Sequence, residues 1–550
     1  MPMTQPLFGL MQDVPLTVDR FLDHAATWHG AREIVSREGD GSLTRLDYAW
    51  LHQTAKRVSN ALARAGIGQG DRVATMGWNS ARHLAAWYGA TNMGAVLHTL
   101  NPRLFAEQIA YIADHAGDRI LLADPACAPL IGPLLAAAPS IERVVFLCAA
   151  AELPATDYAA VAFDDWIADE PAECTWGGFD ERLACGLCYT SGTTGNPKGV
   201  LYSHRSNYLH TMMTLQADAL ALTTRDTVLL IVPMYHANAW GVVYSAPAVG
   251  AKLVLPGARM DGESIYRLIE DEGVTFSAAV PTVWQGLLHY LRQSGARFST
   301  LKRVVIGGSA PPEALIRAFQ DEYGVDVIQG WGMTETSPLA TLSTPSPEVL
   351  EQPYDEQVRR KGMQGRLVCG LEFKLADDEG NRLPHDGRTA GRLKIKGPTI
   401  TSGYFGGEGG NVLDEDGFFD TGDVSTIDAA GYMQITDRAK DIVKSGGEWI
   451  SSIEIENIAV GHPEVALAAV IGVAHPKWDE RPILLIQRHA EARCGRAELL
   501  AFLDGKIARW WMPDDVVVVD EIPLGATGKI DKKLLRQRMA GYVLPELAAG

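Results

Sequence analysis

Residues 190–199, TSGTTGNPKG, bring together side chains that suit phosphate binding: four hydroxyl groups, three glycines and one lysine. Glycines allow the backbone to approach a ligand closely, and successive N–H groups of such a loop form an anion-binding concavity. The lysine adds a compact positive charge for phosphate oxygens. The candidate phosphate-binding residues are Thr190, Ser191, Gly192, Thr193, Thr194, Gly195 and Lys198.

This run differs from the phosphate loop of the common nucleotide hydrolases. That loop requires Gly directly before Lys and Ser or Thr directly after it, whereas Pro197 precedes Lys198 here and Gly199 follows it. A surface loop of small polar residues is the alternative interpretation. The composition is too specific for a linker, so we expect a phosphate site.

Two glycine-containing segments supply groups for the rest of a nucleotide. Residues 329–335, QGWGMTE, place an aromatic face between glycines, and Glu335 offers a hard oxygen ligand for Mg²⁺. Alone, such a segment is more often a turn in the core, but beside a phosphate loop it favours a nucleotide site. The candidate residues are Gly330, Trp331, Gly332, Met333, Thr334 and Glu335, and the second segment contains Gly308, Ser309 and Ala310.

Three further patterns follow in order along the chain. DTGD ends at Asp423, and Arg438 and Lys440 lie just beyond it. Residues 445–454 read SGGEWISSIE, in which the capping-box spacing of Ser451 and Glu454 predicts a helix start. The loop GATGK ends at Lys529, where a lysine is usually only solvated.

Together these ordered motifs, which span nearly the whole chain, resemble the adenylate-forming enzymes: acyl-CoA synthetases, luciferases and the adenylation domains of peptide synthetases. The residues of several motifs are most similar to those of acyl-CoA synthetases for medium-chain fatty acids and 3-methylthiopropanoate. The resemblance implies that Asp423 binds the ribose hydroxyls, that Arg438 supports ribose and phosphate, that Lys440 is a hinge and that Lys529 is catalytic. Trp331 stands where the family commonly has a tyrosine that stacks on adenine, and Gly308, Ser309 and Ala310 match the segment that lines the other side of the base.

The family also implies a coenzyme A route and an acyl pocket. The expected coenzyme A residues are Lys444, Ser445, Gly446, Gly447, Glu448 and Trp449. His236 matches the aromatic gate beside the carboxylate, and a core histidine is its alternative. Trp240 and Trp284 are bulky and would shorten the pocket, which favours short- to medium-chain acids.

The resemblance implies an ATP-dependent, AMP-forming carboxylate–CoA ligase that works through an acyl-adenylate. ATP and coenzyme A would be co-substrates, and Mg²⁺ would bind Glu335 with Thr190 as a neighbour. A luciferase-like oxygenase shares these motifs, and a carrier-loading domain would be expected to have a carrier segment after Lys529. A non-catalytic nucleotide sensor would be expected to lose Lys529 or Glu335, and both are present.

Short β-branched runs that alternate with amphipathic helices must position these groups. Strands are expected at 226–232, 252–255, 274–279, 303–306 and 326–328, with a helix at 263–272. This alternation predicts parallel sheets with ligands beyond the carboxyl ends of the strands. We expect an α/β fold: a large N-terminal domain (1–437) with parallel sheets flanked by helices, a hinge (438–440) and a small mobile C-terminal α+β domain (441–550).

Bulk composition limits the partners. The chain has 550 residues, 47% of them hydrophobic, and a net charge of −18, which gives no electrostatic reason to bind nucleic acid or anionic membrane. No apolar run reaches the ~18 residues of a membrane span, and no secretory signal is visible. Seven cysteines favour a reducing compartment, so a cytoplasmic location is expected. The sequence leaves a homodimer open.

Overall fold

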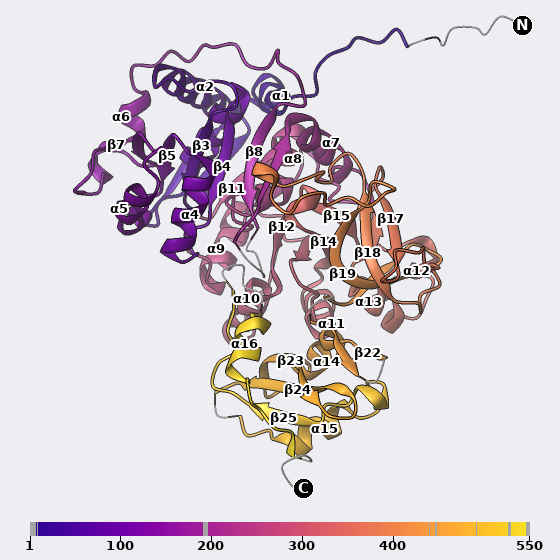
Figure 1. Cartoon of the computed structure of the whole chain (residues 1–550). Coiled ribbons are helices and arrows are strands. Elements are labelled where there is room, and N and C mark those ends of the chain that lie inside the picture. Colours follow the sequence, from indigo (N-terminus) through magenta and orange to yellow (C-terminus); the bar gives the residue numbers. More distant parts are fainter. Residues whose placement is uncertain are drawn as a thin grey trace, which may run out of the picture.

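The computed structural model describes residues 7, 9–190, 196–438, 441–445, 448–490, 492–525 and 530–545. Within these residues the strands form four sheets, three of them before residue 439 and one after residue 440. Figure 1 shows the last sheet, in yellow and light orange, as a separate small layer below the main body.

The nine-stranded sheet is parallel through its centre, where β1, β11, β10, β12, β13 and β14 are neighbours. Its strands, in spatial order, are β16 (Arg366–Leu367), β15 (Leu339–Leu342), β14 (Asp326–Gly332), β13 (Arg303–Gly307), β12 (Phe276–Ala279), β10 (Thr227–Leu229), β11 (Lys252–Leu255), β1 (Glu33–Arg37) and β2 (Leu43–Asp47).

The seven-stranded sheet is parallel except at one edge, where β9 runs antiparallel to β8. Its order is β7 (Ala160–Ala162), β6 (Arg143–Phe146), β5 (Ile120–Ala123), β3 (Arg72–Met76), β4 (Val96–Leu100), β8 (Ala184–Tyr189) and β9 (Gly199–Ser203).

Helices form three layers, one between these two sheets and one on the outer face of each. Their packing on the sheets gives three large hydrophobic cores. Between the sheets lie α1 (Asp19–His29), α2 (Tyr48–Arg64), α3 (Ala81–Asn92), α7 (His204–Thr214) and α8 (Val242–Val249). On the outer faces lie α9 (Gly262–Glu272), α10 (Pro281–Ser294) and α11 (Glu313–Arg317), and, on the other sheet, α4 (Ala106–Ala116) and α5 (Ala128–Ala137). Smaller helices are α6 (Phe163–Ile167), α12 (Pro347–Leu350) and α13 (Tyr354–Lys361).

Two smaller units complete the chain, an antiparallel sheet and a mixed one in which β24 and β25 run parallel. The four-stranded sheet contains β17 (Glu372–Ala376), β18 (Gly391–Lys396), β19 (Phe419–Ile427) and β20 (Met433–Arg438). The C-terminal unit contains β21 (Val443–Ser445), β22 (Glu448–Ile450), β23 (Val465–His475), β24 (Asp479–Arg488), β25 (Asp515–Val518), α14 (Ser452–Val460), α15 (Arg496–Leu503) and α16 (Lys532–Arg538). The predicted fold class, parallel sheets with helices followed by a small α+β unit, is confirmed.

Local sequence explains why the elements begin and end where they do. The side chain of Asp261 accepts a hydrogen bond from Ser264 N and caps α9, which ends at Gly273 with φ of +66°. The five predicted strands all form, but only the strand at 252–255 has the predicted bounds: β12 begins two residues later than predicted, and β13 ends one residue later. β10 stops at Leu229, and β14 runs on to Gly332 because β15 pairs with its end across a bulge at Trp331 and Gly332.

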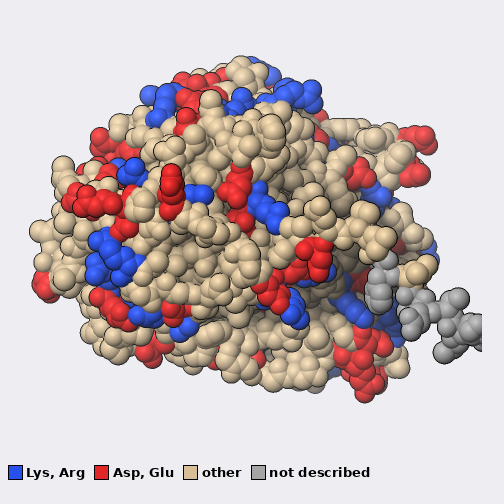
Figure 2. Space-filling view, turned by 90° about the horizontal axis from the view of Figure 1, so that it is seen from above, with Lys and Arg blue, Asp and Glu red and all other residues tan. Residues whose placement is uncertain are grey.

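The net negative charge is not gathered into one patch on the face seen from above. Figure 2 shows acidic and basic side chains interspersed over this face. Among the described residues, none of the helices combines the length and apolar character needed to cross a membrane.

Candidate active site

The two ends of the phosphate-binding run meet in a β-hairpin. β8 and β9 pair antiparallel with Tyr189 opposite Gly199. The backbone N–H of Thr190 donates to Lys198 O at 2.9 Å, and Lys198 N donates to Thr190 Oγ1 at 3.4 Å. These contacts hold Thr190 and Lys198 side by side at the carboxyl end of β8. The predicted residues Ser191, Gly192, Thr193, Thr194 and Gly195 lie outside the described residues.

The Glu335 carboxylate is buried near this hairpin. It lies on a short 3₁₀ turn, Thr334–Thr336, and is 7% exposed. Burial raises the pKa of Glu335, and a hydrogen bond from the Tyr404 hydroxyl to Oε1, 2.8 Å long, acts in the opposite direction. Lys198 Nζ lies 4.9 Å from the centre of the Tyr404 ring.

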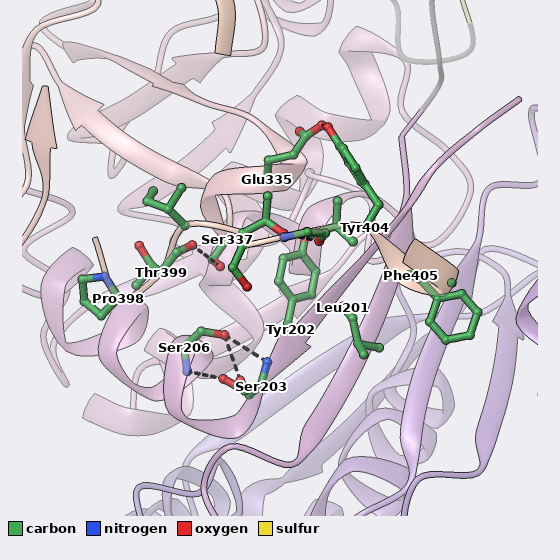
Figure 3. A pocket seen from close by; sticks show the side chains of 16 residues that line it. Leu201, Tyr202, Ser203, Ser206, Glu335, Ser337, Pro398, Thr399, Tyr404 and Phe405 are labelled. Atoms are coloured by element: carbon green, nitrogen blue, oxygen red, sulfur yellow. Dashed lines mark hydrogen bonds between the residues drawn. The ribbon is translucent and has the colours of Figure 1, made fainter. Parts of the chain in front are cut away.

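A cavity of about 530 Å³ opens beside Glu335 and Tyr404. It is lined by β9 and by residues 398–406, and in Figure 3 the Glu335 carboxylate and the Tyr404 hydroxyl point toward one another at its edge. The backbone of the turn is fixed as well, because Thr401 N donates to Glu335 O at 2.8 Å and Tyr202 Oη donates to Thr334 O at 2.7 Å.

The predicted ribose-binding residues meet across the four-stranded sheet. Asp423 on β19 is 1% exposed and lies directly opposite Arg438 on β20. Arg438 Nε is 2.8 Å from Asp423 Oδ1, and the indole Nε1 of Trp331 donates to Oδ2 at 3.0 Å. One carboxylate therefore joins β14 of the nine-stranded sheet to the four-stranded sheet.

The two segments predicted to enclose the base lie on neighbouring strands. Gly307 at the end of β13 is paired with Gly330 on β14. Gly308, with φ of +82°, turns the chain away from the sheet and leads to Ser309 and Ala310. Gly332 has no room for a side chain, because a Cβ there would lie 1.9 Å from Pro338 O. Met333 and Thr334 then lead into the turn that carries Glu335.

The predicted acyl segment contains a left-handed turn. Its residues run from Ala237 to Gly241, and each has a φ between +42° and +80°. His236 immediately precedes this turn and is partly buried. The Trp240 ring packs against the backbone of Gly307, where a Cβ would lie 2.8 Å from the ring. The turn thus brings Trp240 beside the segment predicted to contact the base.

Trp284 lies elsewhere. It is fully buried in the core that α9, α10 and α11 form on the opposite face of the nine-stranded sheet from Trp240. Its Nε1 donates to Ala279 O at 3.2 Å, and its ring packs edge-on against Phe319 at 5.7 Å. The Trp284 indole is thus part of this core, and its role in the acyl pocket stays a prediction.

Several C-terminal predictions fall outside the described residues. These are Lys440, Gly446, Gly447 and Lys529, and the side chains of Lys444, Glu448 and Trp449. Ser445 is buried, and its hydroxyl accepts a hydrogen bond from Arg481 Nη1 at 3.2 Å. Ser451 caps α14 by accepting a hydrogen bond from Glu454 N, which confirms the predicted helix start.

Tyr404 is a site residue that the sequence did not predict. The only signal was its place in the glycine-rich run SGYFGGEGG, which marks close backbone packing and gives no chemical role. Tyr404 links Lys198 and Glu335, which lie next to strands of different sheets, and such a link depends on tertiary packing.

The chain matches two family models, "AMP-binding enzyme" over residues 21–405 and "AMP-binding enzyme C-terminal domain" over residues 454–529. It therefore belongs to the AMP-binding enzyme family, which confirms the predicted resemblance. A 3-methylmercaptopropionyl-CoA ligase of Ruegeria lacuscaerulensis is 46% identical, over 96% of this chain and 98% of the relative. A medium-chain-fatty-acid–CoA ligase of Ectopseudomonas oleovorans is 45% identical, over 98% of each.

A solved structure, the anthranilate CoA ligase AuaEII in complex with anthranoyl-AMP, superposes with a TM-score of 0.85 at 26% identity. The superposition covers 97% of this chain and 100% of that chain. The agreement extends over the whole architecture, including the C-terminal unit.

Proposed function

We propose that this protein is an ATP-dependent, AMP-forming acid–CoA ligase that activates a short- to medium-chain carboxylic acid, either a fatty acid or 3-methylthiopropanoate. The observation that carries the proposal is the contact chain from Lys198 through Tyr404 to Glu335, at the phosphate-binding hairpin. The names of the two relatives at 45% and 46% identity support the same activity and the two classes of acid.

The reaction has two steps. A carboxylate oxygen of the acid attacks the α-phosphorus of ATP, the bond to the β-phosphate oxygen breaks, and pyrophosphate leaves. The sulfur of coenzyme A then attacks the acyl carbon, the thiol proton is lost, and AMP leaves. Lys198 would neutralise the outgoing phosphates and Lys529 the carboxylate and α-phosphate, because such transfers depend on positioning and charge neutralisation.

The Glu335 site fits a magnesium ion. Its carboxylate is buried, and Tyr404 holds one oxygen by a hydrogen bond. Among the described residues no group of three His, Cys, Asp or Glu side chains could hold a metal, so the ion's other ligands would come from the nucleotide, with Thr190 nearby. Bound there, Mg²⁺ would neutralise phosphate charge.

We further propose a cytoplasmic enzyme, with 438–440 as the hinge between residues 1–437 and 441–550. All seven cysteines are unpaired, which suits a reducing compartment. A homodimer remains a prediction that light scattering would test.

The test is a panel of carboxylic acids from four to twelve carbons, with 3-methylthiopropanoate, assayed for pyrophosphate release and for coenzyme A-dependent formation of AMP and thioester. With short- to medium-chain acids we expect pyrophosphate release and coenzyme A-dependent formation of AMP and thioester. Pyrophosphate release without a thioester product would instead favour the luciferase-like or carrier-loading alternatives. Absence of pyrophosphate release with every acid would refute the proposal.

A further inference from the structure

Tyr404 contacts two groups of opposite charge that lie next to strands of different sheets. Its hydroxyl donates to Glu335 Oε1 at 2.8 Å, and its ring face lies 4.9 Å from Lys198 Nζ. Lys198 directly precedes β9, whereas Glu335 lies in the turn that follows β14. A single side chain thus joins the two charges expected to handle the phosphates.

The two contacts use different parts of the tyrosine. The hydroxyl donates to a carboxylate that has little water around it, and a charge-assisted hydrogen bond of this kind favours the ionised form. The ring face attracts an ammonium group and so restricts Lys198, whose four-carbon stem is otherwise flexible. Removing the hydroxyl should affect Glu335, and removing the ring should affect Lys198 as well.

The backbone around Tyr404 is held on both sides. A Cβ on Gly199 would lie 3.0 Å from the Phe405 Cβ, so the segment packs directly on the first residue of β9. Beyond the 3₁₀ turn Phe405–Gly407, the Glu408 carboxylate accepts a hydrogen bond from Tyr111 Oη at 3.2 Å. These contacts fix the position from which the tyrosine reaches both charges.

We propose that Tyr404 is a positioning residue that holds Glu335 and Lys198 in place for the nucleotide phosphates. This inference rests on the proposed function. It assigns the hydroxyl to the metal-binding carboxylate and the ring to the phosphate-binding lysine, so the two effects are separable by substitution.

The test compares Tyr404→Phe, which keeps the ring, with Tyr404→Leu, which removes both contacts. Tyr48→Phe is the matched control, because its buried hydroxyl donates to Ala251 O in the core between the sheets. Calorimetry of ATP binding as a function of Mg²⁺ concentration gives a readout that is independent of turnover, and thermal unfolding shows whether each variant folds.

For Tyr404→Phe we expect the Mg²⁺ concentration that supports half-maximal ATP binding to rise about tenfold. ATP binding at saturating Mg²⁺ should stay near wild type. Tyr404→Leu should also weaken ATP binding at saturating Mg²⁺. Both variants should keep thiolysis of supplied acyl-adenylate, and Tyr404→Phe should add little to Glu335→Gln.

An unchanged Mg²⁺ dependence in Tyr404→Phe, or an equal effect of that change in the Glu335→Gln background, would overturn the inference. If Tyr404→Leu does not fold, the Mg²⁺ dependence of ATP binding by Tyr404→Phe decides whether the inference holds. If the wild type releases no pyrophosphate with any acid, the proposed ligase function fails, while the ATP-binding measurement still reports on Tyr404.

Discussion

The indole N–H of Trp331 donates a 3.0 Å hydrogen bond to Asp423, the carboxylate expected to bind the ribose. Trp331 therefore does more than offer an aromatic face: it also occupies one oxygen of Asp423, while Arg438 lies against the other. A tyrosine at this position would place its hydroxyl elsewhere than the indole N–H. The tryptophan and the Asp423 carboxylate therefore form one hydrogen-bonded unit.

Trp331→Phe keeps an aromatic face and removes this N–H. We expect KM for ATP to rise about tenfold, because a hydrogen bond to a charged group contributes roughly 1.5 kcal/mol. Trp284→Phe is the matched control, since it removes an indole hydrogen bond in the core. The control should lower the melting temperature and leave KM for ATP unchanged. Equal effects of the two variants on KM would contradict the assignment.

Lys529→Ala should slow adenylation by about 10²–10³, because a preorganised charge at the transferring phosphate is lost. Thiolysis of supplied acyl-adenylate should remain. Single-turnover assays of each half-reaction measure the difference, and Lys533→Ala, an exposed lysine on α16, is the control. Equal damage to both half-reactions would show that the lysine serves both.

Trp240→Ala should shift preference toward longer acids. Removing the indole beside Gly307 opens volume, and each newly buried CH₂ contributes about 0.8 kcal/mol. The measurement is the ratio of kcat/KM for an eight-carbon acid to that for a four-carbon acid. Trp284→Ala, which opens space on the other face of the sheet, should leave this ratio unchanged. An unchanged or falling ratio in Trp240→Ala would place Trp240 outside the acyl pocket.

Buried histidines should make the fold sensitive to acid. Burial lowers the pKa of His83 and His210 to about 4, from an ordinary value of 6.5. Below pH 6.5 these histidines bind protons in the unfolded chain but stay neutral in the folded chain. The free energy of unfolding therefore decreases as pH falls from about 6.5 to about 4, by up to ~1.4 kcal/mol per pH unit for each histidine. His210→Gln, which can still accept the Leu339 N–H, should flatten the slope of melting temperature against pH.

Periodic segments were predictable from the sequence, and contacts between distant segments were not. The strand at 252–255 has the predicted bounds, and the predicted helix at 263–272 differs from α9 by one residue. The length of β14 depends on β15, and the core position of Trp284 depends on helix packing. The left-handed turn before α8 has no local signal, because alanine and tryptophan rarely adopt positive φ. In the candidate site, the sequence motifs identified the functional side chains. The contacts that Tyr404 and Trp331 make with them depend on tertiary packing and were not predictable.

The candidate nucleotide site draws its groups from three sheets and the loops beside them: Lys198 between β8 and β9, Trp331 on β14 with Glu335 in the turn after it, and Asp423 on β19. A nucleotide that touches all of them binds only while the sheets are docked together. ATP at 100 times its Kd would therefore stabilise that docking by about 2.7 kcal/mol. Resistance of the large domain to proteases would then follow the nucleotide supply, and the protein would be degraded fastest when ATP runs low.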